Sequence, residues 1–232
     1  MSEVHTERIK RFREAGLYLV TSQALSAGRT TPEIVKAALA GGVKLIQLRE
    51  KDMSLREYVA LARVVREMTA RAGALFMIND RVDVALAVGA DGVHLGQDDF
   101  PVRDARRLAP DLIIGASTHS IEEAARAQRD GASTINIGPI YPTGTKVWEG
   151  AFLGLDGLRS IAAVARVPFS VMGGIKTAHI PGLLAAGAGV IALVTAVTCA
   201  GDPEFATREL LAMIKSAPGA EAWPTEGTET RA

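Results

Sequence analysis

The residues best able to do chemistry follow short apolar runs, and one of these runs ends in alternating polar side chains. Its last part reads Gln47-Leu48-Arg49-Glu50-Lys51. Side chains alternate along an extended strand, so we expect Gln47, Arg49 and Lys51 on one side, where an amide meets two cations. That cluster suits a multiply charged phosphate. The alternative is a solvated charged loop, but such a loop does not require this alternation at a strand end.

Two carboxylates end neighbouring apolar runs and are candidates for a metal site. Asp80 and Asp99 lie 19 residues apart, about one strand-helix unit, so their side chains can converge. Mg²⁺ commonly takes one or two protein carboxylates and completes its octahedron with water and phosphate oxygens. The competing interpretation is that each aspartate caps a helix, before Val82 in one case and near Pro101 in the other.

Further candidates follow the later apolar runs. Gly173 and Gly174 lack side chains, so their backbone N–H groups can approach an anion. His119 could be a general acid or base, and its role stays open, whereas His94 lies inside an apolar run and is interpreted as a structural residue, packed and hydrogen-bonded. Cys199 has no histidine motif beside it, which disfavours a nucleophilic role.

Stretches that alternate between strand and helix must position these residues. Four times, near residues 42, 89, 131 and 187, a glycine ends an Ala-rich helix and an apolar strand follows. A further apolar run lies before the first of these positions and one lies in each of the three intervals between them. Residues 17–21, 75–78, 113–116 and 167–172 supply those extra strands. Eight strands that alternate with helices predict a single α/β domain, a (β/α)₈ TIM barrel. An open doubly wound sheet is the alternative, but no GxGxxG follows the first strand.

The ends of the chain and two helices complete the predicted organisation. Residues 1–16 form a charged N-terminal segment or helix, 17–215 the barrel, and 216–232 a disordered tail that is rich in Pro, Gly, Glu and Thr. Apolar spacing predicts a helix over 55–71, and Ser120 followed by Glu123 predicts a capped helix over 121–129.

Composition excludes several classes of partner. The 26 basic and 26 acidic residues cancel, so no overall positive field attracts nucleic acid or an anionic membrane. A single cysteine excludes a disulfide framework and fits the cytoplasm, and residues 1–14 lack the apolar stretch of a secretory signal. Residues 180–201 carry no charge and are long enough to span a bilayer, but Pro181 and Gly182 interrupt them and 190–194 is interpreted as a buried strand.

Taken together, six motifs resemble the thiamine phosphate synthase family. They occur in a consistent order between about residues 17 and 214, and six in register are far more specific than any one of them. The motifs are 47–51 (QLREK), 78–80 (IND), 92–99 (GVHLGQDD), 115–117 (GAS), 138–146 (GPIYPTGTK) and 173–175 (GGI).

The resemblance implies an Mg²⁺-dependent transferase that joins a pyrimidine methyl pyrophosphate to a thiazole phosphate and releases thiamine phosphate and pyrophosphate. It implies that Asp80 and Asp99 are the metal ligands and that the partners are small-molecule substrates. The enzyme would be a monomer or a homo-oligomer. Arg49, Lys51, Ser117 and Lys146 would be catalytic. The substrate-binding set would be Gln47, Leu48, Arg49, Glu50, Lys51, Asn79, Ser117 and Lys146 for the pyrimidine pyrophosphate, and Thr143, Gly144, Thr145, Gly174, Val194 and Thr195 for the thiazole phosphate.

Departures from the family pattern and two competing functions remain. Val147-Trp148-Glu149 stands where the family often has a charged residue, and Thr195 stands where serine is common, which keeps the hydroxyl. A related thiazole tautomerase could use His119, but it has little need of a pyrophosphate clamp. A phosphate-binding barrel without catalysis is the third possibility, since fold alone does not establish a reaction.

Overall fold

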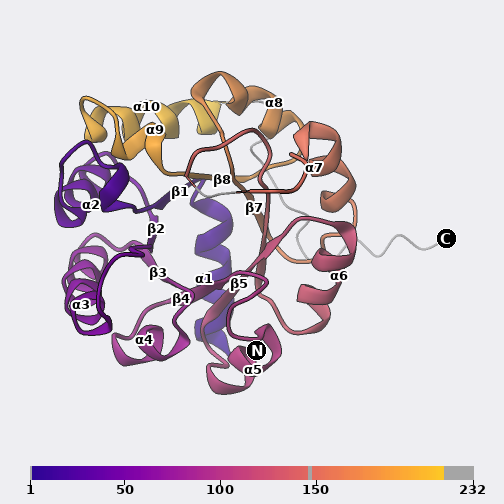
Figure 1. Ribbon diagram of the computed structural model, residues 1–232, viewed down its shortest axis with the longest axis horizontal. Coiled ribbons are helices and arrows are strands. Elements are labelled where there is room, and N and C mark those ends of the chain that lie inside the picture. Colours follow the sequence, from indigo (N-terminus) through magenta and orange to yellow (C-terminus); the bar gives the residue numbers. More distant parts are fainter. Residues whose placement is uncertain (1, 146–147, 217–232) are drawn as a thin grey trace.

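The strands close into a parallel barrel in sequence order, as the sequence analysis predicts. The computed structural model describes residues 2–145 and 148–216, and Figure 1 looks down the barrel with the eight strands around its centre. Lys146 and the predicted tail beyond residue 216 lie outside the described residues. The strands are β1 (Leu17–Val20), β2 (Leu45–Leu48), β3 (Leu75–Asn79), β4 (Gly92–Leu95), β5 (Ile113–Thr118), β6 (Thr134–Ile137), β7 (Phe169–Val171) and β8 (Val190–Leu193).

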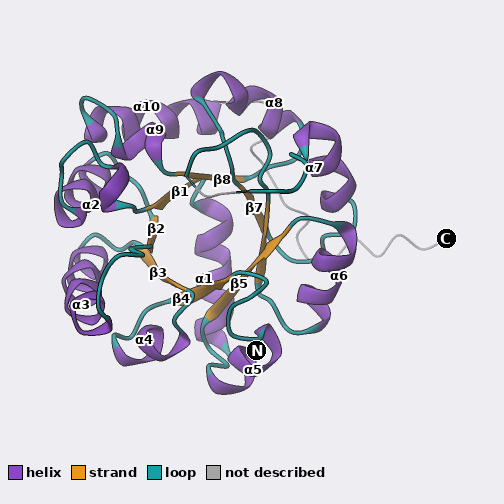
Figure 2. Ribbon diagram, viewed as in Figure 1, coloured by secondary structure: helices purple, strands orange, loops and turns teal. Residues whose placement is uncertain are grey.

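Helices surround the barrel in a continuous outer ring (Figure 2). The predicted helix over 55–71 is found with those bounds, and both Thr30–Glu33 and Ser54–Glu57 form capping boxes at helix starts. The helices and short 3₁₀ turns are α1 (Glu3–Glu14), η1 (Gln23–Leu25), α2 (Thr31–Ala40), α3 (Leu55–Arg71), α4 (Val82–Ala87), α5 (Val102–Leu108), α6 (Ile121–Arg129), α7 (Gly154–Ala162), η2 (Thr177–His179), α8 (Ile180–Ala185), α9 (Thr195–Thr198) and α10 (Pro203–Ser216).

The cap of α6 differs from the predicted box by one residue. Ser120 Oγ accepts a hydrogen bond from Glu123 N, as predicted, but the Glu123 carboxylate accepts from the backbone of His119 rather than that of Ser120. Glu123 therefore ties the helix start to the residue that precedes its cap, and this bond helps to hold His119 in place.

Two apolar clusters explain why the strands are nearly continuous hydrophobic runs. Alternate side chains point outward against the helices, where Leu48, Ile46 and Val65 belong to the larger cluster. The others point into the barrel, where Leu45 and Met77 belong to the smaller one. Because a parallel barrel strand is covered on both faces, both sets must be apolar except where the barrel opens.

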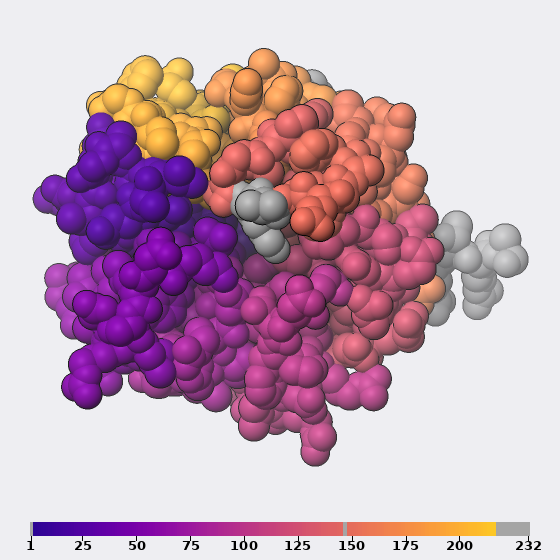
Figure 3. Space-filling view, viewed as in Figure 1, coloured from indigo at the N-terminus to yellow at the C-terminus, as the bar shows by residue number. Residues whose placement is uncertain are grey.

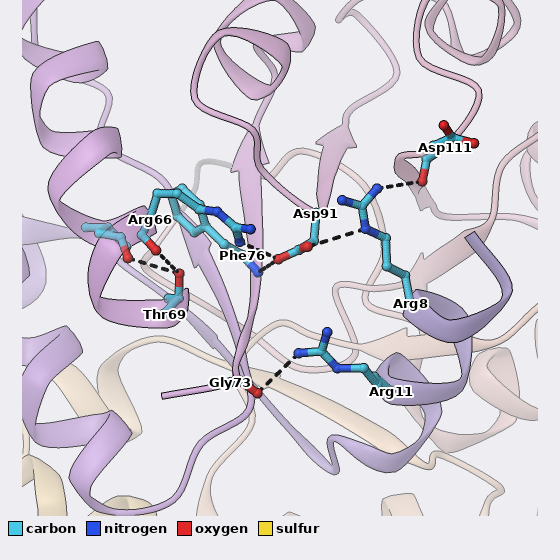
Figure 4. Close-up of polar contacts among 9 residues, drawn as sticks. Arg8, Arg11, Arg66, Thr69, Gly73, Phe76, Asp91 and Asp111 are labelled. Atoms are coloured by element: carbon cyan, nitrogen blue, oxygen red, sulfur yellow. Dashed lines mark hydrogen bonds and ion pairs between the residues drawn. The ribbon is translucent and has the colours of Figure 1, made fainter. Parts of the chain in front are cut away.

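Helix α1 closes the amino end of the barrel. Phe12 is buried with the interior cluster, and α1 contacts β3, β5 and β8; Figure 1 shows the indigo helix across the barrel opening. Polar contacts pin it in place (Figure 4): Arg8 lies 3.3 Å from Asp91, which also pairs with Arg66 at 2.7 Å. Asp91 further accepts the backbone N–H of Phe76 at 2.9 Å, so one carboxylate links α1, α3 and β3.

The uncharged stretch over 180–201 divides into α8, β8 and α9. In the part of the chain that the structure describes, no helix combines the length and the apolar character needed to cross a bilayer. Tertiary packing of the short strand between two helices thus accounts for its apolar composition.

Candidate active site

A cavity of about 610 Å³ opens at the carboxyl ends of the strands. In Figure 3 the face of the molecule is hollowed near its centre, beside the salmon-coloured segment that follows β6. This end of a parallel barrel is where loops bring side chains from several strands together. The predicted residues that line the cavity are Gln47, Arg49, Lys51, Asn79, Asp80, Asp99, Ser117, Thr143, Gly144, Thr145, Gly174, Val194 and Thr195.

Buried polar side chains form the floor of the cavity. Gln47 Nε2 donates to the Tyr18 hydroxyl at 2.6 Å, and Asn136 Nδ2 donates to Ser170 Oγ at 2.6 Å. Burial raises the pKa of the Tyr18 phenol, an effect only partly offset by the bond to Gln47, so this hydroxyl stays neutral. Each buried amide is therefore anchored from the barrel side while it faces the cavity.

The two cations of the 47–51 segment lie on one wall, as the alternation predicts. Arg49 and Lys51 both line the cavity, and they also line a second cavity of about 500 Å³ beside it. The Arg49 backbone N–H donates to Thr21 Oγ1 at 3.0 Å, which fixes the turn after β2 against the turn after β1. Both cations thus face the same cavity. Among the described residues Lys51 pairs with Asp80, whereas Arg49 forms no ion pair.

Asp80 and Asp99 converge, as the sequence analysis predicts. Both carboxyl groups line the cavity and interact with each other, Lys51 Nζ lies 2.5 Å from Asp80 Oδ2, and Asp99 Oδ2 accepts from Gly96 N at 2.7 Å. Burial and then the neighbouring Asp80 raise the pKa of the Asp99 carboxyl. Burial opposes ionisation of Asp80 too, but its bonds with Asp99 and Lys51 outweigh that effect and lower its pKa. Two carboxylates in contact favour a proton or a metal cation between them.

The alternative role of these aspartates as helix caps does not fit the geometry. The cap of α4 is Arg81 and that of α5 is Pro101, and neither makes a side-chain capping bond. Asp80 instead adopts φ +61°, a left-handed conformation that non-glycine residues rarely take, while its backbone N–H donates to His94 O at 2.8 Å. This turn directs the chain away from the strand as the Asp80 carboxylate lines the cavity.

The loops after β6 and β7 approach each other closely on another side of the cavity. Gly174 has φ +61°, and a Cβ at this position would collide with the carbonyl oxygens of Tyr141 and Pro142. Lys176, two residues further on, also lines the cavity. Glycine is therefore required for the approach, and the same segment brings backbone N–H groups and a cation to one place.

His119 lies at the rim, where the chain departs from the family pattern. Its ring packs against Trp148 with centroids 4.5 Å apart, and both residues line the cavity. His119 Nδ1 hydrogen-bonds to the carbonyl of Gly138, which can only accept, so Nδ1 carries the proton and Nε2 is an acceptor in the neutral ring. His94 is hydrogen-bonded, as predicted, through Nε2 to Ser117 Oγ at 2.9 Å, and it also lines the cavity.

The structure does not bring every predicted residue into the cavity. Leu48 is fully buried in the apolar layer beneath the helices, because alternation points it away from the barrel interior. Glu50 lines only the second of the two cavities and accepts bonds from Thr21 Oγ1, Gln23 N and Thr31 Oγ1. Lys146 lies outside the described residues.

Some lining residues escaped the sequence analysis. Asn136 lies within an apolar strand, where a single polar residue at an inward position is the signal that could have identified it. Lys176 could have been found by its spacing from Gly174. Trp148 drew attention only as a departure from the family, because a loop residue carries no periodicity that would place it at the cavity.

Comparisons with known proteins agree on one family. A family described as thiamine monophosphate synthase matches residues 17–197. A thiamine-phosphate synthase of Moorella thermoacetica is 45% identical over 204 residues, 88% of this chain and 97% of the relative. One from Chloroflexus aurantiacus is 46% identical over 198 residues, 85% and 92% of the two chains.

A solved structure gives the same result. Thiamine phosphate pyrophosphorylase from Pyrococcus furiosus superimposes with a TM-score of 0.81 at 39% identity, covering 89% of this chain and 98% of the other. The residues that the family matches, 17–197, include all those that line the cavity, from Val20 to Ala196, so the similarity extends to the site as well as the fold. The chain is therefore an enzyme, a transferase that belongs to the thiamine monophosphate synthase family.

Proposed function

We propose that this enzyme condenses 4-amino-2-methyl-5-(diphosphooxymethyl)pyrimidine with a thiazole phosphate to give thiamine phosphate and pyrophosphate. The observation that carries the proposal is the meeting of Arg49 and Lys51 with the Asp80–Asp99 pair in one cavity. Cations and a metal-binding carboxylate pair at one wall match the charge of a pyrophosphate. The names of the relatives, thiamine-phosphate synthases, agree with this assignment.

The donor set fits Mg²⁺. Asp80 and Asp99 offer hard oxygen ligands in one cavity, and no group of three or more His, Cys, Asp or Glu side chains suited to a metal occurs in the described ranges. At phosphate sites Mg²⁺ commonly binds one or two carboxylates, and water and phosphate oxygens occupy its remaining coordination positions. When bound there, Mg²⁺ would offset negative charge on the pyrophosphate.

The reaction asks mainly for charge stabilisation and orientation. The C–O bond to pyrophosphate breaks with its electron pair, which leaves a cation delocalised into the aminopyrimidine ring, and the thiazole nitrogen lone pair then forms the new C–N bond. Arg49 and Lys51 would bind the departing pyrophosphate, and Ser117, oriented by His94 at 2.9 Å, would donate a further hydrogen bond. Lys146 is proposed to add a cation from the loop after β6.

The second phosphate would bind across the cavity. Backbone N–H groups at Gly174 and near Thr195, the hydroxyls of Thr143 and Thr145, and the Lys176 ammonium surround this part. Holding the thiazole phosphate there aims its ring nitrogen at the pyrimidine carbon, so much of the barrier is lowered by orientation. Tautomerisation and phosphate binding without catalysis explain less, because neither requires both the carboxylate pair and the paired cations.

A single assay tests the proposal. The purified enzyme is incubated with both substrates, with and without Mg²⁺, and pyrophosphate and thiamine phosphate are measured together. We expect equal amounts of the two products, only when both substrates and Mg²⁺ are present. Isomerisation of the thiazole phosphate alone would instead assign the chain to the tautomerase, and binding without any product would reduce it to a binding protein.

A further inference from the structure

The barrel floor contains a layer of four side chains from alternate strands. Gln47 on β2, His94 on β4, Asn136 on β6 and Ala192 on β8 all line the cavity. Layers of four from alternate strands are the packing rule of such barrels, but they are usually filled by bulky apolar side chains. Here three members are polar and the fourth is small, so the layer presents polar atoms around an open space over Ala192.

The two carboxamides of this layer have the same orientation. Gln47 Nε2 donates to Tyr18 and Asn136 Nδ2 donates to Ser170, both at 2.6 Å, and both acceptors lie on the neighbouring strand, one layer closer to the amino end. With the nitrogens engaged below, the carbonyl oxygens are left for the cavity. Across residues 2–145 and 148–216 no hydrogen bond to Gln47 Oε1 or Asn136 Oδ1 is found.

The Asn136 side chain is 2% exposed, and its Oδ1 opens on the cavity rather than lying sealed without a partner. A ligand that covers this oxygen displaces its water, and binding is weakened unless the ligand supplies a donor in return. The carboxamide, held by Ser170, therefore presents an acceptor that a donor on a bound ligand can satisfy.

The chemistry of the two substrates identifies which one supplies the donor. The pyrimidine carries an exocyclic amino group with two N–H bonds, whereas the thiazole ring carries neither N–H nor O–H. An acceptor pair at the floor can therefore select only the pyrimidine. Strands β2 and β6 lie opposite each other in the closed order, so a flat ring over Ala192 would lie between the two carboxamides.

We propose that Asn136 is a specificity-determining residue whose Oδ1 accepts a hydrogen bond from the pyrimidine amino group, with Ser170 as the positioning residue that orients the carboxamide. This inference rests on the proposed function, because it takes the aminopyrimidine as substrate. Gln47, which belongs to the family motif, contacts the same ring from the opposite strand. Asn136 thus supplies a second hydrogen-bond acceptor that selects for the aminopyrimidine ring.

Binding without turnover tests this directly. The affinities of the pyrimidine pyrophosphate and of an analogue with hydrogen in place of the amino group are measured by calorimetry, with Mg²⁺ and without thiazole phosphate. In Asn136→Leu we expect affinity for the amino compound to fall about tenfold, the scale of one buried hydrogen bond, with affinity for the analogue changed less than about twofold. The preference for the amino group should shrink accordingly.

Other variants separate the specific role from a structural one. Asn136→Asp keeps acceptor oxygens at nearly the same size and should retain the preference, while Ser170→Ala should reduce it in part. Thr134→Val is the matched control, because Thr134 is buried on the same strand, two residues toward the amino end, and does not line the cavity. That variant should bind both compounds as the wild type does.

The outcomes distinguish this inference from the proposed function. If Asn136→Leu weakens both compounds equally, or leaves the preference unchanged while the wild type makes thiamine phosphate, Asn136 does not read the amino group and this inference alone is wrong. If Asn136→Leu does not fold, Asn136→Asp and Ser170→Ala decide the matter by the same preference. A wild type that forms no thiamine phosphate from both substrates overturns the proposed function itself.

Discussion

The two ends of the barrel use the same side-chain types for different purposes. At the amino end, the buried Asp91 carboxylate pairs with Arg8 and Arg66 and accepts a backbone N–H, so its charge is fully compensated (Figure 4). At the carboxyl end, Asp80 faces the same cavity as another carboxylate, Asp99, with which it interacts, and its ion pair with Lys51 involves a lysine that is 52% exposed. One arrangement is complete without a ligand and the other is not.

Stabilising charges differ from functional ones in how completely the fold compensates them. A carboxylate surrounded by cations and N–H groups contributes to folding, because breaking such a buried set leaves uncompensated charges. Carboxylates in mutual contact store repulsion that a metal cation relieves. Substitutions at the amino end should therefore lower stability and spare the chemistry, and substitutions at the carboxyl end should do the reverse.

The largest expected effect is on stability, at Asp91. Asp91→Asn removes the charge shared by Arg8 and Arg66, and we expect the free energy of unfolding to fall by about 2–3 kcal/mol. Denaturant unfolding followed by circular dichroism measures this. The matched control is Asp156→Asn, whose pair with Arg159 is exposed and should contribute less than about 1 kcal/mol. Equal losses in the two variants would show that Asp91 is no more than a surface charge.

Next in size is the effect of the carboxylate pair on metal use. Asp80→Asn and Asp99→Asn each remove an anionic ligand at constant size, and we expect the Mg²⁺ concentration for half-maximal rate to rise by about 10- to 100-fold. Titration of the synthase rate with Mg²⁺ measures it, and the unfolding free energy should change by less than about 1 kcal/mol. Variants that match the wild type in Mg²⁺ dependence would remove both residues from the metal site.

A smaller effect concerns the pH dependence of stability at the amino end. Burial, reinforced by the charge of Arg106, lowers the pKa of His5 in α1 below its ordinary value of 6.5. The unfolded chain therefore takes up this proton more readily, so the contribution of His5 is present above about pH 6.5 and is lost as the pH falls below it. His5→Gln should flatten the decline of unfolding midpoints between about pH 7 and 5. A decline as steep as that of the wild type would contradict the prediction.

The smallest expected effect is at His119, despite its place at the cavity rim. Departure of pyrophosphate and capture by the thiazole nitrogen need no proton from the protein, so His119→Asn should keep the synthase rate within a factor of a few. Removing a true general acid or base costs about 10²- to 10⁴-fold. The rate is measured with saturating Mg²⁺ and both substrates. A loss on that scale in a folded variant would bring His119 into the chemistry.

Local patterns in the chain were sufficient to predict the barrel, its eight strands and the end at which the polar residues gather. Continuous apolar runs, Ala-rich helices and glycine stops recur because each strand must be covered on both faces and each helix must end before the next strand. The same alternation correctly predicted that Arg49 and Lys51 face one cavity. It also explains why Leu48, which lies between Gln47 and Arg49, points into the apolar layer instead.

Contacts between distant segments could not be predicted in this way. Glu50 bonds to Thr21 and Thr31, Asn136 bonds to Ser170, and Asp91 joins three elements, because closure of the barrel brings together residues far apart in the chain. The periodicity of apolar residues predicts the face of a helix or strand on which a side chain lies. It does not predict which side chain of another element will contact it there. Sequence patterns therefore predict many of the residues that face the cavity, and folding decides which of them already have partners and which are left for a ligand.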